Sequence, residues 1–187
     1  MQTGWRLPFQ PRVLEYVSET GRLRRTIYAP GSSEAWKRTD SDGRPQLRLE
    51  WWSGELWLID PDDVLINVDR RGGTKLGIYG FDVRGLKYHR PAARSGDFSP
   101  GRRVELVREP ANKIDPNAVA VRALGASAIA GYVNKQLART VARLLDGGTN
   151  LYALCLRGAA AGTSPHKIAV LAGQPELVAH LGRNLRT

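Results

Sequence analysis

One helix pattern, set among short strand patterns, is the feature that most limits the fold of residues 78–187. Asn134 is a favourable N-cap, because its side-chain oxygen can accept from a free N–H of the first helical turn. Apolar residues then recur along one helix face, at Leu137, Val141, Leu144 and Leu145. The Gly147-Gly148 pair predicts the helix end. Short strands around one inserted helix favour a small closed or nearly closed β-barrel.

Six segments around this helix have strand composition. They are residues 78–88, 104–107, 118–121, 128–133, 151–156 and 167–171. Residues 91–101 hold two Pro, two Gly and two Ser, which predicts a loop. A short last helix is expected at residues 175–181, since Pro175 suits the first turn and Gly182 can end it.

The first 75 residues are also β-rich. Strand patterns occupy residues 25–29, 46–52, 55–59 and 64–68. Ser53-Gly54 separates the second pattern from the third and predicts a hairpin, whereas the polar residues 31–44 predict a loop. A basic, Gly-rich stretch at residues 70–75 marks a soft boundary. We therefore expect a β-rich region at residues 1–75, without a recognised family motif, and a second domain at residues 76–187.

The charge balance narrows the possible partners. Lys and Arg number 28 against 18 Asp and Glu, the formal net charge is +10, and the isoelectric point is near 10.2. Such a chain favours a polyanion, with nucleic acid the first candidate and an anionic membrane surface the second.

The expected location is cytoplasmic, with nucleoid association if the source is bacterial. The sequence has no apolar run of about 18 residues, so no transmembrane helix is expected, and its start lacks the apolar core of a signal peptide. Of the two candidate polyanions, DNA is the expected partner and a membrane is not. Cys155, the single cysteine, lies in the apolar run 151–156 and is predicted to be a buried structural thiol, which suits a reducing compartment.

The most specific segment is residues 101–121. A strand pattern ends in Arg-Glu-Pro at 108–110, a loop with Asn112 follows, and Asp-x-Asn-Ala at 115–118 leads into the next strand pattern. Two further motifs flank it, Gly-Leu-Lys-Tyr at residues 85–88 and Gly-Tyr at 131–132 before the helix. These three blocks in this order resemble the HIRAN domain, over about residues 79–173.

HIRAN domains are known as accessory modules of fork-remodelling DNA translocases and as standalone or fused modules in bacteria. The best-understood members capture the 3′ end of single-stranded DNA in a pocket on an OB-like barrel. The resemblance implies a mainly β, OB-like barrel that binds single-stranded DNA or 3′ ends without catalysis, in repair, replication or defence. A helicase, nuclease or other repair protein is the implied protein partner.

The resemblance assigns eight residues to the nucleic-acid site. They are Lys87, Tyr88 and His89 on the predicted first strand, Asn112, Ile114 and Asp115 in the loop, and Tyr132 and Lys135 at the helix start. The chain departs from the pattern of characterised DNA binders at Ile114, where they have an aromatic residue, and at His89, where they have tyrosine.

Elementary chemistry gives these residues compatible roles. The Tyr88 ring can stack on a base, a contact that contributes about 1–3 kcal/mol. Lys87 and Lys135 can each neutralise a phosphate. Asp115 can accept a hydrogen bond from a 3′-hydroxyl, and Asn112 can both donate and accept.

Structural roles are alternatives for several of these residues. Asp115 and Asn117 are residue types that bond the backbone of their own loop, and Arg108 with Glu109 would form an ion pair. One face of the predicted helix is basic, with Lys135, Arg139 and Arg143. This face is either a phosphate-binding ridge or a solvated surface. The predicted N-terminal hairpin carries Trp51, Trp52 and Trp57. Tryptophans on a hairpin pack in the core or across strands more often than they stack on bases.

Two other function classes are alternatives to DNA binding. A metal-dependent nuclease or hydrolase needs clustered carboxylates, but the acidic residues 60–63 have the composition of a turn. The histidines at 89, 166 and 180 lack metal-ligand spacing, and no catalytic triad or phosphate-cradling motif is present, so no metal, cofactor or catalytic residue is expected. A protein-interaction or regulatory adaptor is the other alternative, and its binding would depend much less on salt.

Overall fold

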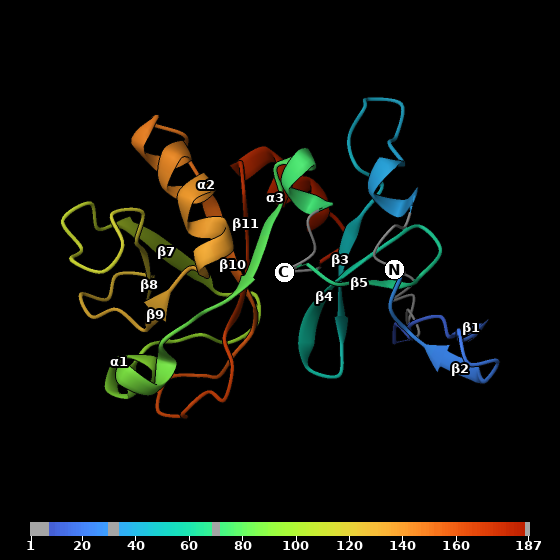
Figure 1. The fold of residues 1–187 in the computed structure, drawn as a ribbon, viewed down its shortest axis with the longest axis horizontal. Coiled ribbons are helices and arrows are strands. Elements are labelled where there is room, and N and C mark those ends of the chain that lie inside the picture. Colours follow the sequence, from blue (N-terminus) through green and yellow to red (C-terminus); the bar gives the residue numbers. More distant parts are fainter. Residues whose placement is uncertain (1–7, 30–33, 69–71, 186–187) are drawn as a thin grey trace, which may run out of the picture. The chain divides into compact units, whose positions relative to one another are not determined.

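The computed structural model describes residues 8–29, 34–68 and 72–185 and is mainly β (Figure 1). The chain divides into two compact units. The N-terminal unit comprises Met1–Asn67 together with Leu181–Thr187. The barrel unit comprises Val68–His180.

A curled antiparallel sheet forms the barrel unit. Its strands are β6 (Tyr79–Asp82), β7 (Arg103–Arg108), β8 (Val119–Ala123), β9 (Gly131–Tyr132), β10 (Tyr152–Arg157) and β11 (Ala169–Gly173), in the order β6-β11-β10-β7-β8-β9. Just beyond β6, Arg84 N–H donates to the Tyr132 carbonyl at 2.8 Å, and Tyr132 N–H donates to the Arg84 carbonyl at 2.8 Å. These two bonds join the ends of the sheet and confirm the predicted small β-barrel.

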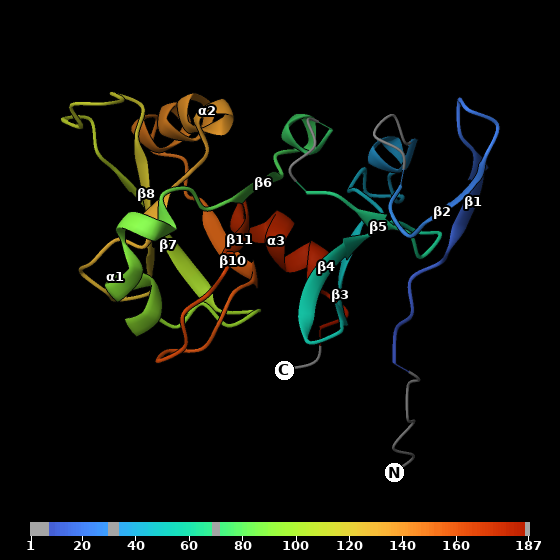
Figure 2. The ribbon, with the colours of Figure 1, turned by 60° about the horizontal axis from the view of Figure 1, so that its bottom comes forward.

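The inserted helix α2 (Lys135–Asp146) begins where the sequence predicts. Asn134 Oδ1 accepts from Leu137 N–H at 3.1 Å, which is the expected N-cap bond. The apolar face buries Ala138, Val141 and Ala142 against the barrel core. Figures 1 and 2 show α2 and α1 (Arg90–Ser95) on opposite sides of the curled sheet. The last helix, α3 (Pro175–Leu181), also has the predicted bounds.

The segment after β6 corrects two predictions. The strand predicted at residues 78–88 ends at Asp82, because Gly85 adopts a left-handed φ of 83° and turns the chain into the 3-10 helix η3 (Leu86–Tyr88). The loop predicted at residues 91–101 was wrong for its first half, which is α1. Pro91 is compatible with this helix because proline lacks only an N–H that the first helical turn leaves unused.

The N-terminal unit contains two antiparallel sheets. Its elements are the hairpin β1 (Leu14–Val17) and β2 (Leu23–Thr26), the 3-10 helix η1 (Glu34–Lys37), and the sheet β3 (Arg48–Trp52), β4 (Glu55–Ile59) and β5 (Leu65–Ile66). The β3–β4 hairpin turns at Ser53-Gly54 as predicted. Sequence reasoning missed β1 and placed β2 at residues 25–29, because β1 and β2 are mostly exposed and lack an alternating apolar pattern.

Two predictions about side chains in this unit are confirmed. The Trp52 and Trp57 rings pack edge to face across the hairpin, with centroids 5.5 Å apart. Asp60 Oδ1 accepts from Asp62 N–H and Val64 N–H, each at 2.9 Å, so residues 60–63 form a turn.

In the parts of the chain that the structure describes, no group of three or more His, Cys, Asp or Glu residues could hold a metal ion. No helix among the described residues has the length and apolarity to cross a membrane.

Cys155 is buried in β10, as predicted, and its chemistry is testable. Its thiol donates to the Phe98 carbonyl at 3.0 Å, and burial raises its pKa to about 12. Because the thiolate is the nucleophile, we expect negligible reaction with a disulfide reagent such as dithionitrobenzoate at neutral pH and complete reaction in denaturant. Time-resolved absorbance of the released thiol measures both, and rapid reaction of the folded protein would contradict the burial.

Candidate nucleic-acid interface

A pocket of about 430 Å³ lies between the β7–β8 loop and the start of α2. We call it the loop–helix pocket; its lining consists of Asn112, Ile114, Asp115, Ala118, Tyr132, Val133, Lys135 and Ala138. Five of the eight predicted site residues therefore meet in one cavity, although they come from two segments separated by strand β8.

The pocket has an apolar floor and a polar rim. Ala118, Val133 and Ala138 are buried and have small side chains, so they leave room above them. The Ile114 side chain, in contrast, is 95% exposed at the pocket. An apolar floor with a few polar groups around it is typical of sites that bind small organic groups.

The β7–β8 loop is held by its own side chains. Asn112 Oδ1 accepts from Ile114 N–H at 3.0 Å and from Asp115 N–H at 3.2 Å. Asp115 Oδ1 accepts from Asn117 N–H at 2.8 Å. The structural alternative for Asp115 is thus confirmed for one of its oxygens. Its Oδ2 has no hydrogen-bond partner among residues 8–29, 34–68 and 72–185, which leaves that oxygen available to a ligand.

Glu109 connects the loop to the helix side of the pocket. Its Oε2 accepts from Asn112 Nδ2 at 2.9 Å and from the Tyr132 hydroxyl at 3.1 Å. Burial, and then the hydrogen bond and charge of Glu109, raise the pKa of the Tyr132 phenol above its ordinary value. Tyr132 therefore remains a neutral ring at physiological pH.

The predicted ion pair between Arg108 and Glu109 was wrong. Successive strand residues point to opposite faces of a sheet, so the two side chains separate. Arg108 instead bonds Asp146 at the end of α2, with its Nε 2.8 Å from Oδ1, and this bond lowers the pKa of Asp146. It also donates to the carbonyls of Ala118 at 2.8 Å and Pro116 at 3.1 Å, which fastens the end of the loop.

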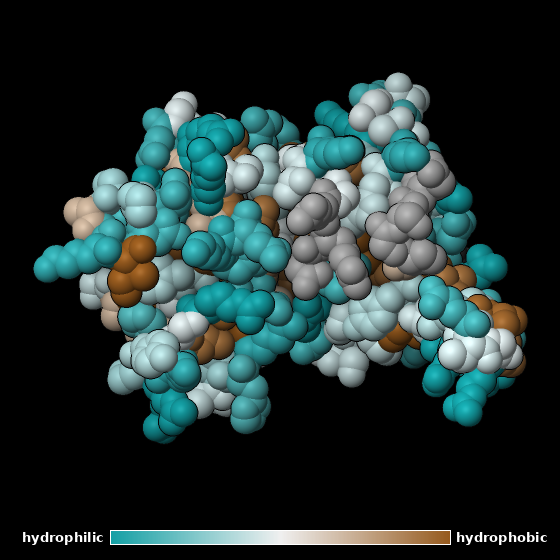
Figure 3. Space-filling model, in the orientation of Figure 1, coloured by the Kyte–Doolittle hydropathy of each residue, from teal (hydrophilic) through white to brown (hydrophobic). Residues whose placement is uncertain are grey.

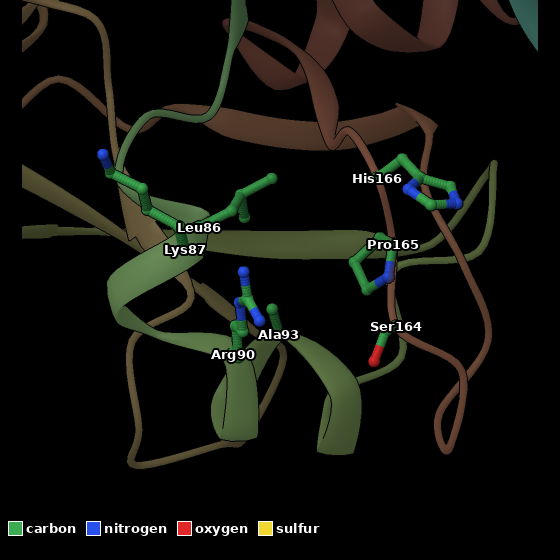
Figure 4. Close-up of a pocket in the computed structure, with 7 residues that line it drawn as sticks. All are labelled: Leu86, Lys87, Arg90, Ala93, Ser164, Pro165 and His166. Carbon is green, nitrogen blue, oxygen red and sulfur yellow. The ribbon is translucent and has the colours of Figure 1, made fainter.

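The remaining three predicted residues lie on and after η3. His89 packs against Tyr132, with ring centroids 5.7 Å apart, and so contacts the pocket wall. The Tyr88 side chain is 75% exposed, and Lys87 Nζ lies 4.8 Å from the centroid of its ring. Lys87 lines a separate cavity of about 380 Å³ between η3, α1 and the segment Ser164 to His166 (Figure 4).

Sequence reasoning did not foresee the roles of Glu109 and Arg108 in positioning the pocket residues. The Arg-Glu-Pro motif was the available signal, but it does not reveal which distant side chains the two residues contact. The basic residues of α1, Arg90 and Arg94, were also missed, because their segment was predicted to be a loop.

The barrel unit is thus a small β-barrel with a surface pocket. Comparison with known proteins identifies the family to which it belongs. The sequence profile of the HIRAN domain matches residues 64–171. This match covers more than half of the chain, so the protein belongs to the HIRAN domain family, whose members are known as nucleic-acid-binding modules.

Three solved structures resemble the chain. The crystal structure of the HIRAN domain of human HLTF is 23% identical, with a TM-score of 0.41 over 56% of this chain and 83% of that one. The NMR structure of the same domain is 18% identical, with a TM-score of 0.34 over 55% and 81%. A crystal structure of a Lactobacillus plantarum protein is 23% identical, with a TM-score of 0.39 over 51% and 95%. No curated protein matches significantly.

Proposed function

We propose that this protein is a non-catalytic module that binds single-stranded DNA and holds a free 3′ end in the loop–helix pocket. The proposal places binding in the C-terminal domain, residues 76–187, and the process in DNA repair, replication or defence. One observation carries it: five residues that the family resemblance assigns to the DNA site line one cavity.

The chemistry of the pocket supports this ligand. The apolar floor suits the terminal base or sugar, and Lys135 at the start of α2 can neutralise the adjoining phosphate. The available Oδ2 of Asp115 can accept a hydrogen bond from a 3′-hydroxyl, whereas its charge repels a 3′-phosphate. The formal net charge of +10 favours encounter with DNA.

Fluorescence anisotropy at two salt concentrations tests the proposal. The ligands are a single strand with a 3′-hydroxyl, the same strand with a 3′-phosphate, and a matched duplex. We expect the 3′-hydroxyl strand to bind most tightly, and added salt to weaken its binding. Equal, salt-sensitive binding of all three ligands would contradict end recognition, and no binding at low salt would contradict DNA binding altogether.

The variant Asp115→Asn tests the proposed contact with the 3′ end. Its Oδ1 keeps the acceptor for Asn117 N–H, so the loop is preserved, but an amide N–H₂ replaces Oδ2. Loss of a hydrogen bond to a charged acceptor should lower affinity for the 3′-hydroxyl strand roughly tenfold or more. Affinity for the 3′-phosphate strand should stay constant or rise, as measured by the same anisotropy assay. Equal losses for both ends would exclude this role of Asp115.

Protein docking by the N-terminal unit is a second candidate function. The β1–β2 hairpin exposes the apolar side chains of Val13, Tyr16, Val17 and Leu23. Figure 3 shows hydrophobic atoms in the region of this hairpin, on a face that is otherwise mostly hydrophilic. Apolar docking of a helicase, nuclease or other repair protein would persist at high salt, which separates it from phosphate binding.

A further inference from the structure

A second basic surface lies in the barrel unit, outside the loop–helix pocket. The cavity of about 380 Å³ beside η3 adjoins another of about 640 Å³ beside α1, and the linings of the two share Arg90 and Ser164. We call the combined cavity the α1 groove. Arg90 and Arg94 are exposed and are four residues apart in α1, so they lie on the same helix face.

The groove is built on fixed elements. Ala93 is buried and anchors α1 to the barrel core. Gly162 N–H donates to the Arg94 carbonyl at 2.7 Å, and Arg94 Nε donates to the Gly162 carbonyl at 3.1 Å. These reciprocal bonds hold the facing loop against α1. A preformed groove binds a ligand without a large ordering cost.

The lining has the chemistry of a phosphate site. Its cationic residues are Lys87, Arg90 and Arg94, and Ser164 can supply a hydroxyl donor, whereas the Ser95 hydroxyl donates to the Ala92 carbonyl at 3.3 Å. Its lining contains no acidic residue among those the structure describes. Figure 4 shows the Arg90 guanidinium projecting into the space between η3 and the Ser164 segment. A guanidinium offers paired N–H donors that match the oxygens of a phosphate.

The segment Lys87-Tyr88-His89 links the α1 groove to the wall of the proposed DNA site. Lys87 lines the groove, Tyr88 follows it on the surface, and His89 packs on Tyr132 in the loop–helix pocket. From a 3′ end, a strand continues only in the 5′ direction. We infer that the α1 groove binds the phosphates of the nucleotides on the 5′ side of the held end, an inference that rests on the proposed function.

The double variant Arg90→Gln with Arg94→Gln tests the inference. The ligands are 3′-hydroxyl oligonucleotides of about 3 and about 12 nucleotides, since OB-type barrels cover roughly 4–16 nucleotides. For the long strand, we expect roughly tenfold weaker binding at low salt. Its plot of log affinity against log salt should become shallower by roughly 0.7 for each lost phosphate contact. Binding of the short strand should not change.

A matched control separates a site from general charge. Arg22 and Arg24 are exposed arginines of the N-terminal unit, and replacing both with Gln removes the same net charge. An equal loss in this control, or an equal loss for short and long strands, would overturn the inference. Because Arg94 also bonds Gly162, Arg90→Gln alone must show a reduced salt slope for the long strand, and an unchanged slope would equally overturn it.

Failure of the inference and failure of the proposed function are distinguishable. If the unaltered protein distinguishes a 3′-hydroxyl from a 3′-phosphate but the α1 variants bind the long strand normally, only the α1 groove is excluded. If the unaltered protein binds neither strand, both proposals are excluded. A 5′ extension of abasic sugar–phosphate units should retain the gain in affinity, and loss of that gain would exclude phosphate recognition.

Discussion

Replacing Tyr88 with alanine is expected to weaken binding of single-stranded DNA by roughly 1–3 kcal/mol, or about 5- to 150-fold, the usual cost of losing one base-stacking contact. The side chain is 75% exposed and sits next to His89, which packs on the wall of the loop–helix pocket. So exposed a ring contributes little to the fold, so the free energy of unfolding should change by less than about 0.5 kcal/mol. Anisotropy titrations at one fixed salt concentration measure the affinity, and urea unfolding measures the stability.

Two controls make this result specific to stacking at η3. Tyr88→Phe keeps the aromatic face and should bind as tightly as the unaltered protein. Tyr16, an exposed tyrosine of the N-terminal unit, should tolerate alanine without loss of affinity. The role of Tyr88 would be excluded if the alanine variant bound DNA normally, or if the phenylalanine variant lost as much affinity as the alanine variant.

Local sequence signals predicted helix α2 correctly. The Asn134 cap, the helical spacing from Leu137 to Leu145 and the Gly147-Gly148 stop lie within one short segment, and together they determine α2. The segment after β6 was mistaken because its signals conflict. Strand-type residues continue past Asp82, but Gly85 adopts a left-handed φ and turns the chain into η3. Pro91 was interpreted as a loop residue, whereas it lies in the first turn of α1.

In the loop–helix pocket, too, contacts between near neighbours in the sequence were predictable, and contacts between distant residues were not. The bonds that Asn112 Oδ1 accepts from Ile114 N–H and Asp115 N–H span two or three residues, and local bonding of this type is the structural alternative that the sequence offers for Asp115. The bonds from Glu109 to Tyr132 and from Arg108 to Asp146 span 23 and 38 residues. Such partners depend on how the strands pair, so no local pattern identifies them. The family motif assigned residues to the pocket without revealing what holds them in place.

Gly131→Ala is expected to produce the largest loss of stability, about 3 kcal/mol or more, because overpacking that displaces backbone falls at the upper end of its usual cost. An added Cβ would contact the Arg84 carbonyl oxygen and lie 2.6 Å from Val83 Cγ1. This is the position where the Arg84–Tyr132 bonds join the two ends of the sheet. The backbone must shift to accommodate the methyl group, and both bonds would be strained.

Gly125→Ala is the matched control, since Gly125 has a left-handed φ of 74° and open space where a Cβ would lie. It should cost about 1 kcal/mol, the usual penalty for alanine in that conformation. Urea or thermal unfolding compares the two variants, and equal costs would exclude close contact as the reason for Gly131. Because Tyr132 is the next residue, the Gly131 variant should also bind DNA more weakly than the Gly125 variant. A stability loss with unchanged DNA affinity would show instead that the barrel closure does not position the pocket.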